Sequence, residues 1–194
     1  MILKIRLLLL IILIFVQILY FPINRSAKNG VILKFPLDNK IPLLPIWAIP
    51  YLLSLLWWIG CFIWGAIKMD DLLLKRFVLS MLFINLVSYV IYILYPTYVI
   101  RPEIHGTGWL NNLIRFIYQN DRIYNAFPSA HAYTSTTVLV FWWKWFPRMW
   151  WIWLCLTIMI LLSALFTRQH YIPDIAGGIA IAIVGYGISL KLKK

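Results

Sequence analysis

The sequence predicts an all-α integral membrane protein, built as a bundle of six transmembrane helices. Of its 194 residues, 63% are hydrophobic and only 12% are charged, whereas soluble domains have about half apolar and about a quarter charged residues. Apolar runs of roughly 20 residues, the length that crosses a bilayer as a helix, recur along the chain. Strands are not expected in these runs, because the open edges of a sheet cannot face lipid.

The predicted spans follow one another through the whole chain, which we interpret as a single domain over residues 1–194. Their ranges are 3–20, 46–67, 75–95, 130–146, 149–167 and 172–190. The first span carries Lys4 and Arg6 as a secretory signal would, but its apolar run is too long and no A-x-A-like cleavage site follows it. We therefore expect a retained anchor helix.

Two long connections, 21–45 and 96–129, separate these spans. The first contains Pro22, Pro36 and Pro42, which favour a turn-rich segment rather than another span. The second is rich in aromatic residues and is predicted to lie at the level of the lipid headgroups as an amphipathic cover.

The chain has a formal charge of +12. The distribution of its basic residues indicates the topology in the membrane rather than nucleic-acid binding. The basic residues are spread over short loops and form no continuous basic stripe, so we expect no nucleic-acid partner. They are densest in the termini and short connections, which places both termini in the cytoplasm by the positive-inside rule. These residues are Lys4, Arg6, Lys68, Lys75, Arg76, Lys144, Arg148, Lys191, Lys193 and Lys194.

This topology brings two polar clusters to the non-cytoplasmic face of the cell membrane. The clusters are residues 127–131, which end at His131, and residues 168–174, which contain His170 and Asp174. Arg101 follows the third span on the same face. Ionisable residues at a bilayer boundary are costly and are therefore functional candidates.

The residue types in these clusters predict phosphoryl transfer without a metal or other cofactor. A neutral His170 can attack phosphorus, and a carboxylate such as Asp174 fixes the tautomer and stabilises the charge that forms. His131 can donate a proton to the departing oxygen. Taken alone, Asp174 could also be a simple helix cap.

Four residues are predicted to contact the phosphate. Ser129 caps the start of the fourth span and, with Ala130, lies at a helix N-terminus whose free N–H groups bind anions. Arg101 and Arg168 can each hold phosphate oxygens with a bidentate guanidinium. Ser129 alone would be a helix cap, so its role depends on the convergence of the other residues.

At these residues the sequence resembles the type-2 phosphatidic acid phosphatase superfamily over about residues 37–190. Arg101-Pro102 resembles the end of the motif K-x6-R-P, Pro128-Ser-Ala-His131 the motif P-S-G-H, and His170 with Asp174 the end of S-R-x5-H-x3-D. The resemblance implies a six-helix phosphatase-like core and metal-free chemistry. It also implies His170 as nucleophile, Asp174 as its orienting carboxylate and His131 as general acid.

The sequence departs from those motifs at three positions. Leu94 replaces the lysine of the first motif, Ala164 the arginine of the third, and Ala130 the glycine of the second. We expect Arg168 to supply part of the missing charge. The string 166–171, Phe-Thr-Arg-Gln-His-Tyr, is similar to the branch that includes inositol phosphorylceramide synthases, in which the phosphoryl acceptor is an alcohol.

These observations support one leading function and two alternatives. The leading hypothesis is a lipid-phosphate phosphatase that hydrolyses a phosphomonoester or pyrophosphate through a phosphohistidine. The first alternative is a phosphotransferase that moves a phosphorylated headgroup to a lipid hydroxyl. The second is a non-enzymatic six-helix carrier or binding subunit, which is less favoured because carriers bind their substrates near the membrane midplane.

Overall fold

The computed structural model describes residues 3–193 as a helical bundle, and within that range no residue belongs to a strand longer than an isolated bridge. The α-helices are α1 Leu3–Ile18, α2 Tyr20–Ser26, α3 Ala48–Lys68, α4 Asp71–Leu94, α5 Trp109–Asn120, α6 Ala130–Trp145, α7 Trp150–Phe166 and α8 Ile172–Ser189. The 3₁₀ helices are η1 Pro36–Lys40, η2 Pro45–Trp47 and η3 Pro147–Met149. The predicted all-α class is confirmed. Lys194 and the first two residues of the predicted domain lie outside the described residues.

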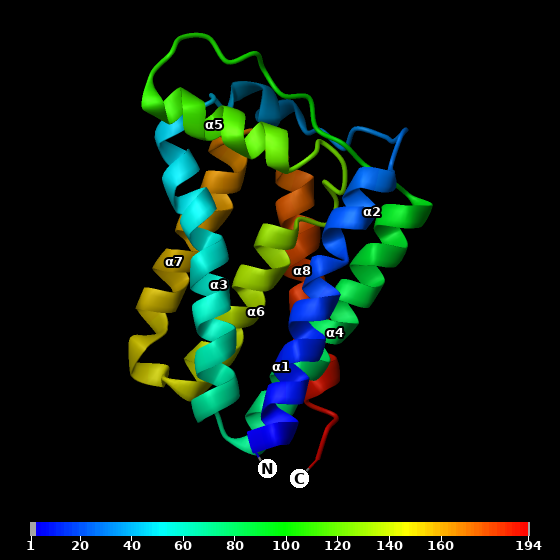
Figure 1. Cartoon of the computed structure of the whole chain (residues 1–194), viewed down its shortest axis with the longest axis vertical. Coiled ribbons are helices and arrows are strands. Elements are labelled where there is room, and N and C mark those ends of the chain that lie inside the picture. The colour runs from blue at the N-terminus through cyan, green and yellow to red at the C-terminus, as the bar shows by residue number, and fades with distance from the viewer. Residues whose placement is uncertain (1–2, 194) are drawn as a thin grey trace.

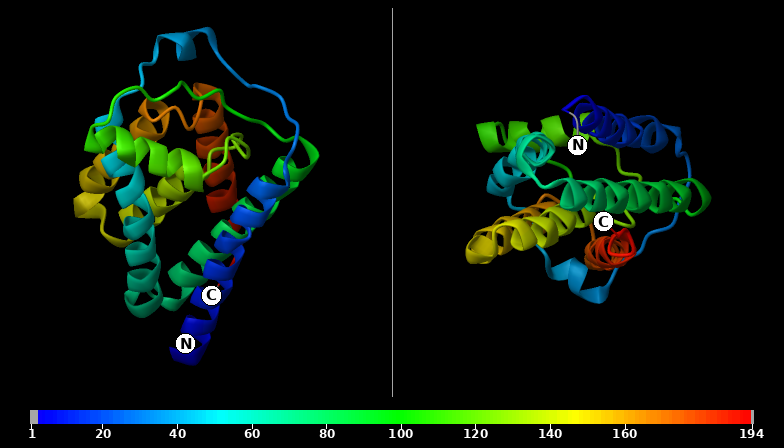
Figure 2. Two further views of the ribbon diagram at one scale, coloured as in Figure 1. Left: turned by 45° about the horizontal axis from the view of Figure 1, so that its top comes forward. Right: turned by 90° about the horizontal axis from the view of Figure 1, so that it is seen from below.

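The long helices run lengthwise, whereas α5 lies across one end of the bundle (Figure 1). Both long connections arch over the α5 end, and both termini lie at the opposite end (Figures 1 and 2). This arrangement agrees with the prediction that the two termini share one side. Which side faces the cytoplasm stays a prediction.

Five helical segments are long and apolar enough to cross a membrane, as expected of a multi-pass membrane protein. They are Leu3–Ser26, Pro45–Lys68, Asp71–Leu94, Pro147–Phe166 and Ile172–Ser189. The predicted span 130–146 forms α6, which has only 16 residues and is not among them. The count of six spans therefore stays a prediction.

The composition of α6 follows from its position inside the bundle. It packs against α3, α4, α7 and α8, and its hydroxyl residues Thr134, Ser135, Thr136 and Thr137 are all buried. Because protein rather than lipid surrounds this helix, hydroxyl groups that bond to nearby carbonyls are tolerated there. Thr137, for example, donates to the carbonyl oxygen of Tyr133 at 2.7 Å.

Two features position the helix ends that carry the polar clusters. Near the termini, a dense apolar core that includes Phe77, Phe141 and Trp142 holds the helices together. At the α5 end, α8 approaches α6 closely at Gly178. A Cβ atom on Gly178 would lie 2.6 Å from Cβ of Ala132 and 2.7 Å from the carbonyl oxygen of Ser129. Only glycine permits this approach.

Candidate active site

The structure brings the two predicted histidines together at the α5 end of the bundle. His131 lies in the first turn of α6, and His170 lies between α7 and α8. Their ring centroids are 5.9 Å apart, and each side chain is almost completely buried. Two imidazoles at this spacing can act on opposite sides of one small group such as a phosphate.

Asp174 lies beside His170, as the sequence predicted. Its Oδ2 accepts the backbone N–H of Tyr171 at 2.8 Å and lies 3.6 Å from Nδ1 of His170. The His170–Asp174 distance is longer than a hydrogen bond, and Nδ1 of His170 and Oδ1 of Asp174 have no protein partner. Catalytic hydrogen bonds are often long before substrate binds, so this distance is compatible with a pairing of His170 and Asp174.

Ser129 connects the starts of α6 and α8. Its Oγ accepts the N–H of Ala132 at 3.3 Å, so the predicted helix cap is present. Its own N–H donates to the carbonyl oxygen of Asp174 at 2.9 Å. Ala130 follows as the first residue of α6. The cap and the backbone bond together hold His131 against the turn that carries Asp174.

Arg101 contacts Gln169, the residue before His170, and makes no hydrogen bond to either histidine in the described residues. Its Nη2 donates to Oε1 of Gln169 at 2.5 Å and to the carbonyl oxygen of Arg122 at 3.0 Å. Its Nη1 donates to the carbonyl oxygens of Tyr118 and Asp121. Protein oxygens therefore occupy the bidentate face that was predicted to hold phosphate, and only the buried Nε lacks a partner.

Arg168 is bound by the first long connection. Its Nη1 donates to the carbonyl oxygens of Asp38 and Ile41, both at 2.8 Å, in the first long connection. The Asp38 carboxylate, itself buried, accepts the N–H of Ile172 at 2.8 Å at the start of α8. The structure thus joins Arg168 to this connection, and its predicted contact with phosphate stays a prediction.

Sequence reasoning missed a group of aromatic and acidic side chains that is joined to His131 through Tyr51. The ring of Tyr51 stacks on that imidazole, with centroids 4.2 Å apart and an interplanar angle of 26°. The hydroxyl of Tyr51 donates to Asp121 Oδ2 at 3.0 Å, and the hydroxyl of Tyr20 donates to Oδ1 at 3.0 Å. Burial raises the pKa of the Asp121 carboxyl, against the opposing effect of Arg101.

Two buried amides next to the motifs were also missed. Gln169 precedes His170, and its Nε2 has no partner. Neither side-chain polar atom of Asn125 has a partner, and this residue adopts a positive φ of 57°. Both ring nitrogens of His131 are unpartnered as well. Buried polar groups normally find partners, so these are atoms that a bound phosphate or hydroxyl could satisfy.

In the part of the chain that the structure describes, several helices could span a membrane and a buried histidine pair lies at one end of the bundle. These features define a multi-pass membrane protein with a buried polar site at one end of its helical bundle. A family model described as the PAP2 superfamily matches residues 73–193, which is more than half of the 194 residues. The chain belongs to the PAP2 superfamily.

Family membership confirms the broader resemblance seen in the motifs and indicates an activity of the phosphatase or phosphotransferase type. Neither the comparison with curated proteins nor that with solved structures gives a significant match. The matched residues contain Arg101, Ser129, His131, His170 and Asp174, whereas Tyr20, Asp38 and Tyr51 lie before them.

Proposed function

We propose that this protein is a lipid-phosphate phosphatase of the cell membrane, acting on a phosphomonoester or pyrophosphate at the non-cytoplasmic face. The observation that carries the proposal is the His170–Asp174 pair, at 3.6 Å, beside the ring of His131. A nucleophile, its orienting carboxylate and a second imidazole are the groups that a two-step displacement at phosphorus requires.

In the first step His170 attacks phosphorus. Its Nδ1 faces Asp174, which leaves Nε2 as the attacking atom. The P–Nε2 bond forms as the bond from phosphorus to the lipid oxygen breaks, and a protonated His131 gives its proton to that oxygen. The products are a lipid alcohol, or a lipid monophosphate from a pyrophosphate, and a phosphohistidine stabilised by Asp174.

In the second step water resolves the phosphohistidine. His131, now neutral, takes a proton from water while the water oxygen bonds to phosphorus and the P–Nε2 bond breaks. Inorganic phosphate leaves and both histidines return to their starting protonation states. None of these steps requires a metal ion.

The remaining predicted residues would bind the phosphate rather than react with it. Ser129 and Ala130 present the N-terminus of α6, and Arg101 adds a positive charge next to Gln169. Arg168 acts at longer range, since its Nη1 is engaged by the first long connection. Charge fixed around the equatorial oxygens stabilises the transition state.

A phosphotransferase that moves a phosphorylated headgroup to a lipid hydroxyl is the second candidate. In that case His170 bonds to the phosphorus of a headgroup phosphodiester while the bond to the donor lipid oxygen breaks, and the hydroxyl of an acceptor lipid replaces water in the second step. The motif departures at Leu94 and Ala164 support it, as does the resemblance of residues 166–171 to the inositol phosphorylceramide synthase branch. Product analysis separates the two candidates: inorganic phosphate supports the phosphatase, and a new phosphorylated lipid supports the transferase.

The test is turnover of labelled lipid phosphates by purified protein, with phosphatidate, phosphatidylglycerol phosphate and a prenyl pyrophosphate as the panel. We expect His170→Ala and His131→Ala each to lower the rate by about two to four orders of magnitude. His105→Ala is the matched control, because His105 is exposed and lies in the same connection as α5. Unchanged turnover in both site variants would contradict the proposed enzymatic function and favour a non-enzymatic carrier or binding subunit.

A further inference from the structure

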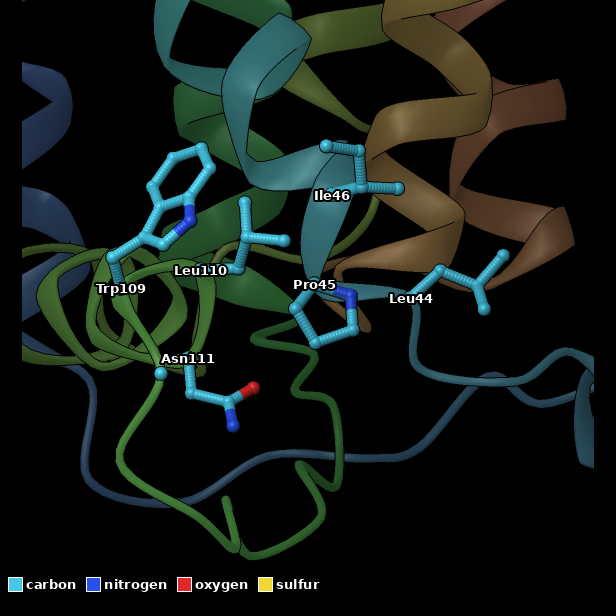
Figure 3. Close-up of a pocket in the computed structure, with 7 residues that line it drawn as sticks. Leu44, Pro45, Ile46, Trp109, Leu110 and Asn111 are labelled. Atoms are coloured by element: carbon cyan, nitrogen blue, oxygen red, sulfur yellow. The ribbon is translucent and has the colours of Figure 1, made fainter.

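Polar atoms at the α5 end of the bundle differ in whether they have a partner. An apolar hollow is formed there by residues 44–46 and 108–111 (Figure 3), and Nδ2 of its polar residue Asn111 donates to a backbone carbonyl oxygen at 2.9 Å. Next to His170, by contrast, Nε2 of Gln169 is buried and has no partner among the described residues. Buried donors normally have partners, so this amide requires an explanation.

The orientation of the Gln169 amide follows from its contact with Arg101. A guanidinium has N–H donors and no acceptor, so the amide must turn its oxygen toward Arg101, and Nη2 donates to Oε1 at 2.5 Å. Nε2 then offers its hydrogens to groups other than Arg101. The donation to Oε1 also polarises the amide and strengthens its N–H groups as donors.

The backbone holds Gln169 and His170 in one fixed arrangement. The carbonyl oxygen of Ala164, near the end of α7, accepts the N–H of Gln169 at 3.0 Å and the N–H of His170 at 3.2 Å. Gln169 is almost completely buried, as His170 is. The amide is therefore fixed by bonds on both its backbone and its side chain, one residue from the predicted nucleophile.

A series of contacts links Gln169 to the other histidine through Arg101. Nη1 of Arg101 donates to the carbonyl oxygen of Asp121 at 2.8 Å. The carboxyl of Asp121 accepts the hydroxyl of Tyr51 at 3.0 Å, and the ring of Tyr51 stacks on His131. The centroids of the two histidine rings are 5.9 Å apart, which closes the series. The amide of Gln169 and both imidazoles thus belong to one connected group of buried side chains.

The positive charge of Arg101 acts on this group mainly through the amide. Each Nη atom of Arg101 already donates to two protein oxygens, and the guanidinium lies over the ring of Tyr118 at 4.5 Å. The carboxyl of Asp121 offsets part of the charge, because Asp121 and Arg101 interact electrostatically. A phosphate at His170 would therefore meet directed N–H groups rather than a free guanidinium.

We propose that Gln169 is a further substrate-binding residue, whose Nε2 donates to an equatorial oxygen of the phosphate that His170 attacks. This inference rests on the proposed function, because it places the phosphorus atom at His170. A fixed donor directed at these oxygens stabilises the negative charge that they carry in the transition state. Gln169 binds the phosphate and takes no part in bond making or proton transfer, and Arg101 is the positioning residue that holds and polarises its amide.

Two substitutions separate contact with phosphate from a purely structural role. Gln169→Glu keeps an oxygen for Arg101 but replaces the donor with a second, negatively charged oxygen, whereas Gln169→Met removes both functions at similar volume. We expect turnover of the preferred lipid of the panel to fall about 10²-fold in Gln169→Met and about 10³-fold in Gln169→Glu. If Gln169 only holds Arg101, Gln169→Glu is the more active of the two, and that order would overturn the proposal.

The matched control for added negative charge is Gln119→Glu. Gln119 is exposed on α5 at the same end of the bundle, so turnover should stay near that of the unaltered protein. Equal losses in Gln119→Glu and Gln169→Glu would show a general charge effect and refute the contact.

Magnetic resonance of the side-chain amides tests the contact in the unaltered protein. The chain has three glutamines, and Nε2 of Gln17 is also buried without a partner in the part of the chain that the structure describes. The full chain, with isotope-labelled glutamine and histidine side chains, is placed in bilayer discs of zwitterionic lipid and titrated with inorganic phosphate. The Nε2 resonance of Gln169, identified by its loss in Gln169→Met, should shift and saturate. Those of Gln17 and Gln119 should stay in place.

The other outcomes of the titration are equally decisive. Shifts of the histidine rings without a shift of Gln169, or equal shifts of all the glutamines, would overturn the proposal and leave the proposed function standing. A titration that moves neither Gln169 nor the histidines would remove the phosphate site itself. Failure of the proposed function alone is a separate result: Gln169 would respond to phosphate, but the unaltered protein would turn over none of the lipids in the panel.

Discussion

Residues 73–193, which the family model matches, and residues 3–72, which precede them, contribute to the site in different ways. The matched region contains His131, His170 and Asp174, the groups predicted to react. The preceding region contains Tyr51, stacked on His131, and Asp38, bonded to the start of α8. The predicted reacting groups are recognised from motifs, whereas the contacts that Tyr51 and Asp38 make with the site are found only by structure.

The contacts between the two regions cross large sequence distances. Arg168 donates to carbonyl oxygens at Asp38 and Ile41, and Asp121 accepts from Tyr20 and Tyr51. Substitutions of the predicted reacting groups in the matched region should therefore remove chemistry, whereas substitutions of the residues that pack around those groups, in either region, should disturb geometry. The predictions below test that division.

The largest effect is expected for Asp174→Asn. The amide oxygen can still accept the N–H of Tyr171, but the charge facing His170 is lost and the tautomer is no longer fixed. Lipid phosphate turnover should fall about 10³-fold or more, with the fold retained. Asp70→Asn is the control, because Asp70 is an exposed helix cap on α4. A similar loss in both variants would contradict a specific role for Asp174.

Gly178→Ala should have the next largest effect, because it forces α8 away from α6. The added Cβ would clash with Ala132 and Ser129, so His131 and Asp174 would shift relative to each other. We expect a loss of about 1–3 kcal/mol in unfolding free energy, and a marked fall in turnover. Gly187→Ala in the same helix meets no atom within 4 Å and should be neutral or slightly stabilising.

Tyr51→Phe tests the preceding region directly. The phenyl ring can still stack on His131, but Asp121 loses one of its two phenol donors. Turnover should fall roughly threefold to tenfold, on the scale of one lost hydrogen bond, and the pH–rate profile should shift. Tyr95→Phe, at an exposed tyrosine, serves as control. If Tyr51→Phe behaves like the control, the preceding region does not act on the site through Asp121.

The smallest effect concerns the pH dependence of stability. Burial raises the pKa of Asp121 above its ordinary value of 3.8, so the folded state holds this proton more tightly than the unfolded state. The stabilisation from Asp121 is complete below 3.8 and is lost as pH rises through the folded-state value. Thermal unfolding of Asp121→Asn should lack this component, and an unchanged pH profile would contradict it.

Composition and topology predict most of the fold. The lengths of the apolar runs indicate where the helices lie, and the alternating direction of successive spans indicates which helix ends share a face. This reasoning is less reliable for α6. Because protein rather than lipid surrounds this helix, it can contain many hydroxyl residues, and its apolar character is weaker than that of a lipid-facing span. In the site, the meeting of His131 and His170 follows from topology. The hydrogen bonds of Arg101 to backbone carbonyl groups could not be predicted, because the sequence gives the charge of a side chain and not the backbone oxygens that surround it in the fold. Likewise, nothing in an apolar helix distinguishes Tyr51 as a neighbour of His131.

The hydrogen bond between Asp38 and the N–H of Ile172 also makes the local opening of the site measurable by hydrogen exchange. That amide proton cannot exchange with deuterium while the first long connection is docked on α8. At high pH, where each opening leads to exchange, its exchange rate reports how often the connection lifts from the turn that holds His170. Comparing that rate with turnover would show whether the connection opens once in each catalytic cycle or stays closed through many.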